Sequence, residues 1–158
     1  MLDVARRAKE QGATVVFDPN FRPTLPDTPD AAAARQHAVL EYVDWYLCGE
    51  GEAELLWPGS EIPLPSVVRV GARGAIVDGT EVPPPTTAAV VDEVGAGDAF
   101  AAGFVFGLLR EWSPAECARA GNVIARFALA GTGDWETLPR LEDVRAELLS
   151  GEGARSSP

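Results

Sequence analysis

The sequence contains very little lysine and histidine. Lys9 is the only lysine and His37 the only histidine among the 158 residues, so twelve of the thirteen basic side chains are arginines. This excludes any mechanism that needs a lysine elsewhere in the chain. A single histidine without a cysteine pair also argues against a zinc site. His37 falls in an alanine-rich helical stretch, where we expect a surface residue.

Long hydrophobic segments are absent as well. The longest apolar run, Ala99–Leu109, has eleven residues, too few to cross a bilayer. The first residues, Met1–Arg7, contain no apolar core of the signal-peptide type. The only two cysteines, Cys48 and Cys117, have no partner motif. We therefore expect two buried thiols in the reducing environment of the cytoplasm.

Basic residues are outnumbered by acidic ones. The chain has 13 bases against 24 acids, which gives a formal net charge of −11. An acidic surface argues against nucleic acid or an anionic membrane as the main partner. It does not exclude an anionic substrate, because a binding site can be locally positive within an acidic protein.

Composition and length indicate one globular domain. Hydrophobic residues make up 46% and charged residues 23% of the chain, ordinary values for a domain with a packed core. We expect this domain over residues 1–150 and a frayed tail over 151–158. The predicted helices are 2–11, 29–42, 50–57, 95–112, a helix starting at 114, and a last one carrying Leu141, Val144 and Leu148. The predicted strands are 13–17, 44–48, 67–70, 75–77 and 89–92. Thr28 is predicted to cap the helix that follows it, and Ser113–Glu116 is predicted to form a capping box. Turns are predicted at Gly71–Gly74 and at Asp78–Gly79.

Strands that alternate with helices predict an α/β fold with a parallel sheet. The chain begins with a helix that feeds a strand, so the strand expected before that helix is missing. We interpret this as a sheet that lacks a neighbouring strand, and expect that residue 1 is not the natural start of a complete fold.

The most informative motif is Val90–Phe104, which reads V-V-D-E-V-G-A-G-D-A-F-A-A-G-F. A predicted strand leads into a glycine turn and then into a helix. The helix N-terminus carries about half a positive charge and free N–H groups, which suit a phosphate. Asp98 could accept the proton of a hydroxyl that attacks a γ-phosphate. The competing interpretation is that Asp98 only caps the helix and the glycines only form the turn.

This motif resembles the C-terminal signature of the ribokinase-like (PfkB) sugar kinases. Four other segments resemble this family in the family's order, and the ending is most similar to the 2-keto-3-deoxygluconate kinase branch. The resemblance covers nearly the whole chain but only the C-terminal half of the family fold, without its lid. The four segments are Val16–Pro23, Val43–Leu56, Val67–Gly74 and the region from Asn122 to Glu136.

The resemblance implies a role for particular residues. Asp98 would be the catalytic base. Gly95, Ala96 and Gly97 would form the anion hole. Asn20 and Arg22 would face phosphates or an acidic sugar, since a guanidinium suits a carboxylate or phosphate. The residues implied in ATP binding are Gly71, Ala72, Arg73, Gly74 and Asn122.

The resemblance also implies metal ions. Glu52 would help to organise Mg²⁺ through water. A monovalent cation such as K⁺ would bind near Asp92 and Val94, with backbone carbonyls around Ala128, Gly131 and Gly133. One position departs from the family pattern, because Gly49 stands where the N-x-x-E motif has Asn.

Three functions follow from these features. The first is an ATP-dependent kinase of a sugar or keto-sugar acid, in incomplete form. The second is a non-catalytic nucleotide-binding remnant or interaction module, which Gly49 and the absent half favour. The third, a dinucleotide-binding oxidoreductase, is weak because the glycine turn comes late in the chain and Phe100 stands at the third glycine position.

An incomplete sheet should leave apolar residues uncovered. We expect self-association through such a surface. The residues expected to be uncovered are Val15, Val16, Phe17, Val90 and Val91.

Overall fold

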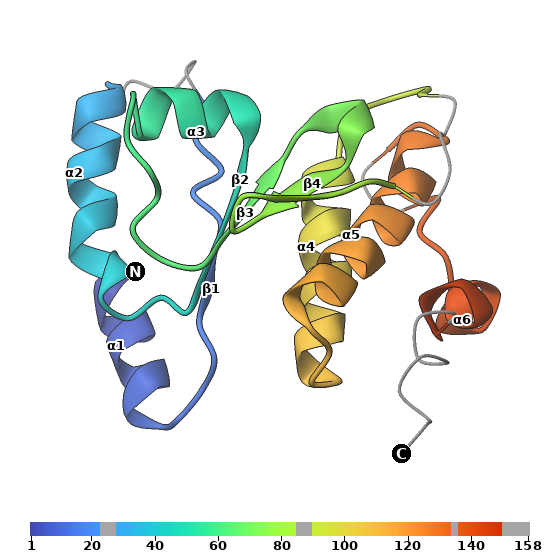
Figure 1. The fold of residues 1–158 in the computed structure, drawn as a ribbon, viewed down its shortest axis with the longest axis horizontal. Coiled ribbons are helices and arrows are strands. Elements are labelled where there is room, and N and C mark those ends of the chain that lie inside the picture. Colours follow the sequence, from blue (N-terminus) through green and yellow to red (C-terminus); the bar gives the residue numbers. More distant parts are fainter. Residues whose placement is uncertain (23–27, 85–89, 134–135, 150–158) are drawn as a thin grey trace. The chain divides into compact units, whose positions relative to one another are not determined.

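The computed structural model describes residues 1–22, 28–84, 90–133 and 136–149 (Figure 1). The chain divides into two compact units, Met1–Val70 and Gly71–Pro158, which are taken one at a time below. The predicted tail, together with Pro85, Ala89, Asp134 and Trp135, lies outside the described residues.

The first unit is a parallel α/β arrangement. β1 pairs with β2 and β2 with β3, both in parallel, with Val16 opposite Trp45 and Leu47 opposite Val67. α1 packs against α2, and α2 against α3 (Figure 1). The elements of this unit are α1 (Leu2–Glu10), β1 (Val16–Phe17), α2 (Pro29–Leu40), β2 (Trp45–Gly49), α3 (Glu50–Leu56) and β3 (Ser66–Arg69).

The core of the first unit lies on β2. Tyr46, Leu47 and Cys48 are fully buried. The Tyr46 hydroxyl donates a hydrogen bond to Gln36 Oε1 at 2.6 Å, which satisfies a polar group that burial would otherwise penalise. Burial also raises the pKa of the Tyr46 hydroxyl far above its usual range. Thr28 begins α2 as predicted, because its hydroxyl accepts the Ala31 N–H at 3.2 Å.

The second unit begins with a short 3₁₀ turn and a hairpin. β4 and β5 pair antiparallel, with Ile76 opposite Glu81, and the Asp78–Gly79 turn joins them as predicted. The described strands therefore pair both in parallel and antiparallel. The elements of this unit are η1 (Gly71–Arg73), β4 (Ala75–Val77), β5 (Thr80–Val82), α4 (Ala96–Leu109), α5 (Pro114–Leu129) and α6 (Leu141–Leu149).

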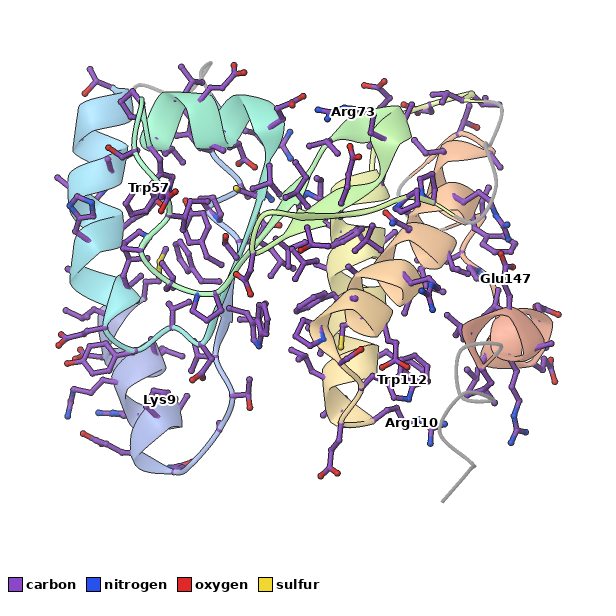
Figure 2. The ribbon with its side chains drawn as sticks, in the orientation of Figure 1. Lys9, Trp57, Arg73, Arg110, Trp112 and Glu147 are labelled. Carbon is purple, nitrogen blue, oxygen red and sulfur yellow. The ribbon has the colours of Figure 1, made fainter. Side chains whose placement is uncertain are left out.

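Helices α4 and α5 pack very closely. A Cβ added to Gly103 would lie 2.6 Å from the carbonyl oxygen of Ala120, so only glycine allows this approach. α5 starts with the predicted capping box, in which the Glu116 carboxylate accepts the Ser113 N–H at 2.8 Å. α6 is joined to α5 by Glu147, whose two carboxylate oxygens accept hydrogen bonds from Arg126 at 2.8 Å each. Figure 2 shows the Glu147 side chain on α6.

The predicted strand over 89–92 is wrong for its described residues. Val90–Asp92 is irregular, and Val90 and Val91 are 59% and 61% exposed. The reason is a long-range contact: the Val91 N–H donates to the Leu129 carbonyl at the end of α5, at 2.8 Å. The Val91 backbone therefore binds a helix terminus instead of a neighbouring strand.

The predicted strand over 13–17 is shorter than expected. Only Val16 and Phe17 pair in the sheet, and Val15, Val16 and Phe17 are half-buried. The backbone at Val15 is bound instead by Asp44, whose carboxylate accepts the Val15 N–H at 2.8 Å and whose own N–H donates to the Val15 carbonyl.

Both cysteines are free and buried, as predicted. Burial raises the pKa of the Cys48 thiol to about 12 and that of the Cys117 thiol to about 11. Both side chains therefore behave as protonated core residues at neutral pH. No helix in the described part of the chain has the length and apolar character needed to span a membrane.

Candidate functional site

The N-terminus of α4 carries the residues of the glycine motif. Gly95 is the N-cap in a left-handed conformation, with φ at +77°, which glycine adopts without steric cost. Its carbonyl accepts the Ala99 N–H at 2.9 Å and so closes the first helical turn. Ala96 and Gly97 are the first two helical residues and are half-buried. The Ala96 N–H donates to the Glu93 carbonyl at 3.3 Å. The Gly97 N–H belongs to the first turn of the helix, whose N–H groups and positive dipole end suit an anion.

Asp98 is the third residue of α4 and is exposed. The alternative in which Asp98 caps the helix is therefore wrong, because Gly95 occupies that position. An exposed carboxylate in the first turn of a helix can approach both a phosphate bound at the helix start and the hydroxyl that attacks it.

The Gly71–Gly74 segment forms the predicted turn. Gly71–Arg73 is a 3₁₀ turn, and the Gly74 N–H donates to the Gly71 carbonyl at 3.0 Å. Gly71, Ala72 and Arg73 are exposed, and Arg73 pairs with Glu81 at 3.2 Å. Gly74 is buried, and a Cβ there would lie 2.4 Å from the Val82 carbonyl oxygen.

Asn122 of α5 lies beside Gly74 of this turn. Its side chain is buried, and its Nδ2 donates to the Val82 carbonyl at 2.9 Å. The same Nδ2 would lie 3.0 Å from a Cβ on Gly74. The structure thus brings Asn122, Val82 and Gly74 together and gives the Asn122 amide an internal hydrogen-bonding role.

The segment implied in cation binding is held by a side-chain turn. Asp92 is half-buried, and its Oδ1 accepts the Val94 N–H at 3.1 Å. Val94 is 54% exposed. Among the described residues, no group of three or more histidine, cysteine or acidic side chains could hold a metal ion.

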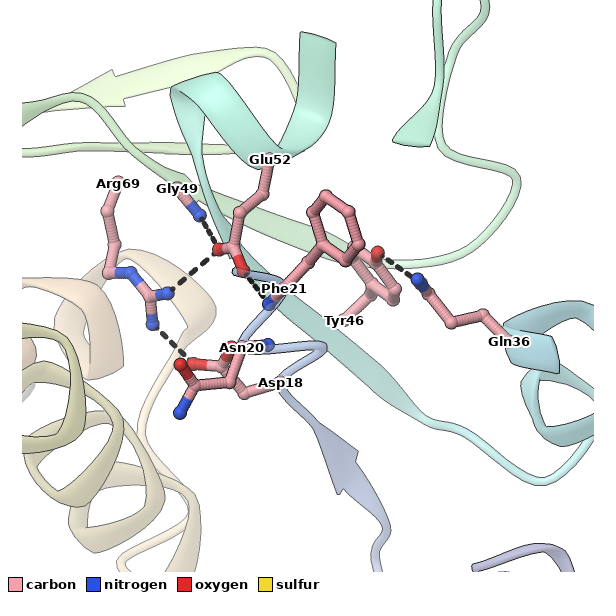
Figure 3. A network of polar contacts seen from close by, with 8 residues as sticks. All are labelled: Asp18, Asn20, Phe21, Gln36, Tyr46, Gly49, Glu52 and Arg69. Atoms are coloured by element: carbon pink, nitrogen blue, oxygen red, sulfur yellow. Dashed lines mark hydrogen bonds and ion pairs between the residues drawn. The ribbon is translucent and has the colours of Figure 1, made fainter. Parts of the chain in front are cut away.

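In the first unit, polar side chains gather where parallel strands end (Figure 3). Asp18 follows β1, Glu52 lies in the first turn of α3 after β2, and Arg69 ends β3. Ligands in open α/β sheets bind at this carboxyl edge. Asn20 and Arg22, the predicted substrate residues, are exposed in the segment after β1.

Glu52 is held by backbone donors. Its Oε1 accepts the Phe21 N–H at 2.5 Å and its Oε2 accepts the Gly49 N–H at 2.7 Å (Figure 3). Its side chain is only 16% exposed. Gly49 is thereby the N-cap of α3, and Glu52 supplies the side-chain cap.

The sequence reasoning did not single out Arg69 as a site residue. The Arg69 guanidinium pairs with Asp18 Oδ2 at 2.6 Å and with Glu52 Oε2 at 3.5 Å. A signal was present in the sequence, because Arg69 is a lone charge in the apolar run Val67–Val70. A charged residue at the end of a buried parallel strand faces the ligand edge or a buried partner.

Comparison with known families matches residues 1–141 to the pfkB family carbohydrate kinases. This chain belongs to the pfkB family of carbohydrate kinases. The 2-dehydro-3-deoxygluconokinase of Bacillus subtilis is 31% identical over 168 residues, covering 91% of this chain and 49% of that protein. An uncharacterized sugar kinase of Archaeoglobus fulgidus is 39% identical over 158 residues, covering 90% of this chain and 60% of that protein.

Solved structures of the family share the fold of this pfkB chain. Aminoimidazole riboside kinase from Salmonella enterica, solved with aminoimidazole riboside and an ATP analogue, superposes with a TM-score of 0.82 at 26% identity. The match covers 93% of this chain and 56% of that one. Fructokinase from Vibrio cholerae O395 superposes with a TM-score of 0.79 at 24% identity, covering 92% and 54%. The predicted ribokinase-like α/β fold is thereby confirmed. The chain spans about half the length of the relatives it matches.

Proposed function

We propose that this chain is the nucleotide-binding and catalytic part of an ATP-dependent kinase that phosphorylates a sugar or a keto-sugar acid. The observation that carries the proposal is the start of α4. There Gly95 adopts the left-handed cap conformation and Asp98 stands exposed in the first turn, in a chain of the pfkB family.

The chemistry follows from these positions. The substrate hydroxyl oxygen attacks the γ-phosphorus, and the bond from that phosphorus to the β,γ-bridging oxygen breaks, so that ADP leaves. Asp98 accepts the hydroxyl proton. The N–H groups of Gly95, Ala96 and Gly97 stabilise the charge on the phosphoryl oxygens.

ATP would bind along the Gly71–Gly74 turn. Gly71, Ala72 and Arg73 are exposed there, and Arg73 adds a positive charge. Asn122 would act near the adenine through the turn that it supports. An ATP analogue and ADP are bound in the Salmonella enterica and Vibrio cholerae relatives, which supports nucleotide use in this chain.

The described carboxylates do not form a cage for magnesium. Mg²⁺ would arrive with the ATP phosphates, as this ion commonly binds through substrate oxygens and few protein ligands. A monovalent cation such as K⁺ would bind near Asp92, Val94 and the backbone carbonyls after α5.

A keto-sugar acid is the substrate class that we favour. Two relatives, from Bacillus subtilis and Haemophilus influenzae, are named 2-dehydro-3-deoxygluconokinases, at 31% and 32% identity. Arg22, exposed after β1, supplies a guanidinium suited to a carboxylate. We place this reaction in the cytoplasm, where ATP and reduced thiols coexist.

The second candidate is a non-catalytic nucleotide-binding module. It is favoured by Gly49, which stands where the family's N-x-x-E motif has Asn. In this case the exposed Val90, Val91 and Val94 would form an interaction surface, either for self-association or for another protein.

ATP binding and phosphoryl transfer must be measured separately to choose between the two. ATP binding is measured on this chain. Phosphoryl transfer is measured on a chimera, which joins this chain to the part of the Bacillus subtilis relative that this chain does not match. If the chain is the catalytic part of a kinase, the chimera should phosphorylate 2-dehydro-3-deoxygluconate. A folded chimera that binds ATP without transferring phosphate to a panel of sugars and sugar acids would support the non-catalytic module.

A further inference from the structure

We infer that Arg69 is a positioning residue, which fixes the segment Asp18–Arg22 through the carboxylates of Asp18 and Glu52. The inference rests on the proposed function only in that Asn20 and Arg22 face the substrate. It assigns Glu52 to the backbone of this segment, not to magnesium.

The first step is that each carboxylate holds one amide of the segment. Asp18 Oδ1 accepts the Asn20 N–H at 3.0 Å, and Glu52 Oε1 accepts the Phe21 N–H at 2.5 Å (Figure 3). Two successive backbone donors are thus bound by side chains, one from Asp18 of the segment itself and one from Glu52 of α3. Hydrogen bonds to charged acceptors are stronger than neutral ones, so this part of the loop is well fixed.

The second step is that Arg69 binds the remaining side of both carboxylates. Its Nη1 lies 2.6 Å from Asp18 Oδ2, and its Nη2 lies 3.5 Å from Glu52 Oε2. The side chains of Arg69, Asp18 and Glu52 are 18%, 23% and 16% exposed. Two carboxylates that lie close together and are largely buried repel one another, and a cation between them offsets this repulsion.

The third step is that the segment needs such support. Asn20 has a φ of +43°, in the left-handed region that non-glycine residues seldom adopt. A conformation of this kind persists only when the surrounding contacts impose it. It turns the chain between Asp18 and Phe21, and so sets the direction in which Asn20 and Arg22 leave the end of β1.

The fourth step concerns Glu52. Both of its oxygens already accept backbone N–H groups, from Phe21 and Gly49, and one of them also faces Arg69. A metal ion or its water would have to compete with these donors. The geometry therefore favours Glu52 as the link between α3 and the Asp18–Arg22 segment.

The test is amide NMR and hydrogen exchange on the whole chain without nucleotide. Arg69→Met should shift the Asn20 and Phe21 amide signals and speed exchange of the Phe21 N–H by roughly tenfold or more. Core amides of β2 should change much less. Arg69→Lys, which keeps the charge but loses the fork, should give intermediate shifts. Arg7→Met, an exposed change on α1, is the control and should leave the segment unchanged.

Glu52→Gln, with exposed Glu54→Gln on the same helix as its control, tests the second link. It should shift the Phe21 and Gly49 signals together. Equal acceleration of exchange throughout β2 and β3 in Arg69→Lys, or unchanged Asn20 and Phe21 signals in Arg69→Met, would overturn the inference.

A magnesium chloride titration of the unsubstituted chain tests whether Glu52 binds magnesium. Saturable shifts at Phe21 and Gly49 that disappear in Glu52→Gln would make Glu52 a metal ligand and also overturn the inference. A separate titration with 2-dehydro-3-deoxygluconate tests the proposed function. Absence of shifts at Asn20 and Arg22 there would count against the substrate class, while the amide results still decide the role of Arg69.

Discussion

Gly95 and Asp98 have different roles at the start of α4. Gly95 takes the N-cap in the left-handed conformation, which leaves Asp98 exposed as the third helical residue. The carboxylate is therefore not consumed by capping. It interacts favourably with the helix dipole, and its charge lies in the same first turn as the backbone of Ala96 and Gly97.

Asp98→Asn separates chemistry from stability. The loss of one charge from an exposed first turn should cost about 0.3–1 kcal/mol of unfolding free energy. If Asp98 is the catalytic base, turnover in the active chimera should fall by roughly 10²–10⁴-fold. The matched control is Glu93→Gln, an exposed carboxylate just before the helix. Turnover that survives Asp98→Asn would remove the proposed base.

Asn122→Ala should destabilise the second unit. The change leaves the Val82 carbonyl without the Nδ2 donor that lies 2.9 Å away in a buried position. A buried acceptor that loses its partner costs about 1–3 kcal/mol, measurable by urea denaturation. Exposed Arg119→Ala, on the same helix, should stay within about 0.5 kcal/mol. Equal losses of unfolding free energy in the two variants would show that the Asn122 hydrogen bond does not stabilise the fold.

Two helical glycines should respond to alanine with opposite signs. Gly103→Ala places a Cβ 2.6 Å from the Ala120 carbonyl oxygen, so α4 and α5 must separate, at a cost of about 1–3 kcal/mol. Gly51→Ala meets no atom within 4 Å and should stabilise α3 by about 0.5–1 kcal/mol. Thermal unfolding of both variants measures the contrast. A neutral Gly103→Ala would contradict the close helix packing.

The Asp44 carboxylate should make stability depend on acid pH. Partial burial alone would raise its pKa, but the hydrogen bonds from Lys9 and the Val15 N–H outweigh burial, and the pKa is lowered in the folded state. The resulting stabilisation is present above the unfolded-state value of about 4. It is lost as the pH falls through the lower folded-state value.

Asp44→Asn should therefore unfold more easily than the unsubstituted chain at pH 7, by about 1 kcal/mol given the half-exposed pair. Below about pH 4 the difference should shrink. Exposed Asp3→Asn is the control. A difference between Asp44→Asn and the unsubstituted chain that stays constant from neutral to acid pH would contradict the lowered pKa.

Local signals in the sequence predicted most elements because the relevant forces were local. The Thr28 cap, the Ser113 capping box and the Asp78–Gly79 turn each depend on neighbouring residues. The strand over 89–92 failed because two valines resemble a strand, whereas the Val91 backbone binds Leu129, a residue far along the chain. No local pattern reports such a partner.

The candidate site shows the same limit. The glycine motif was visible because one short segment carries the turn, the helix start and Asp98. Arg69 was missed because its role depends on its ion pairs with Asp18 and Glu52. These residues are distant in sequence and come together only when the three parallel strands pair. For Asn122, the family resemblance implied a role in ATP binding but did not reveal that its amide binds the Val82 carbonyl.

The central claim is that nucleotide binds at the Gly71–Gly74 turn and at the start of α4. The most direct measurement is a titration of the isotope-labelled chain with magnesium-ATP, followed through its backbone amide signals. The account predicts saturable shifts at Gly71–Gly74 and Gly95–Asp98, with α1 and α6 unchanged. Shifts confined to α1 or α6, or saturation without any change at Gly95–Asp98, would contradict it.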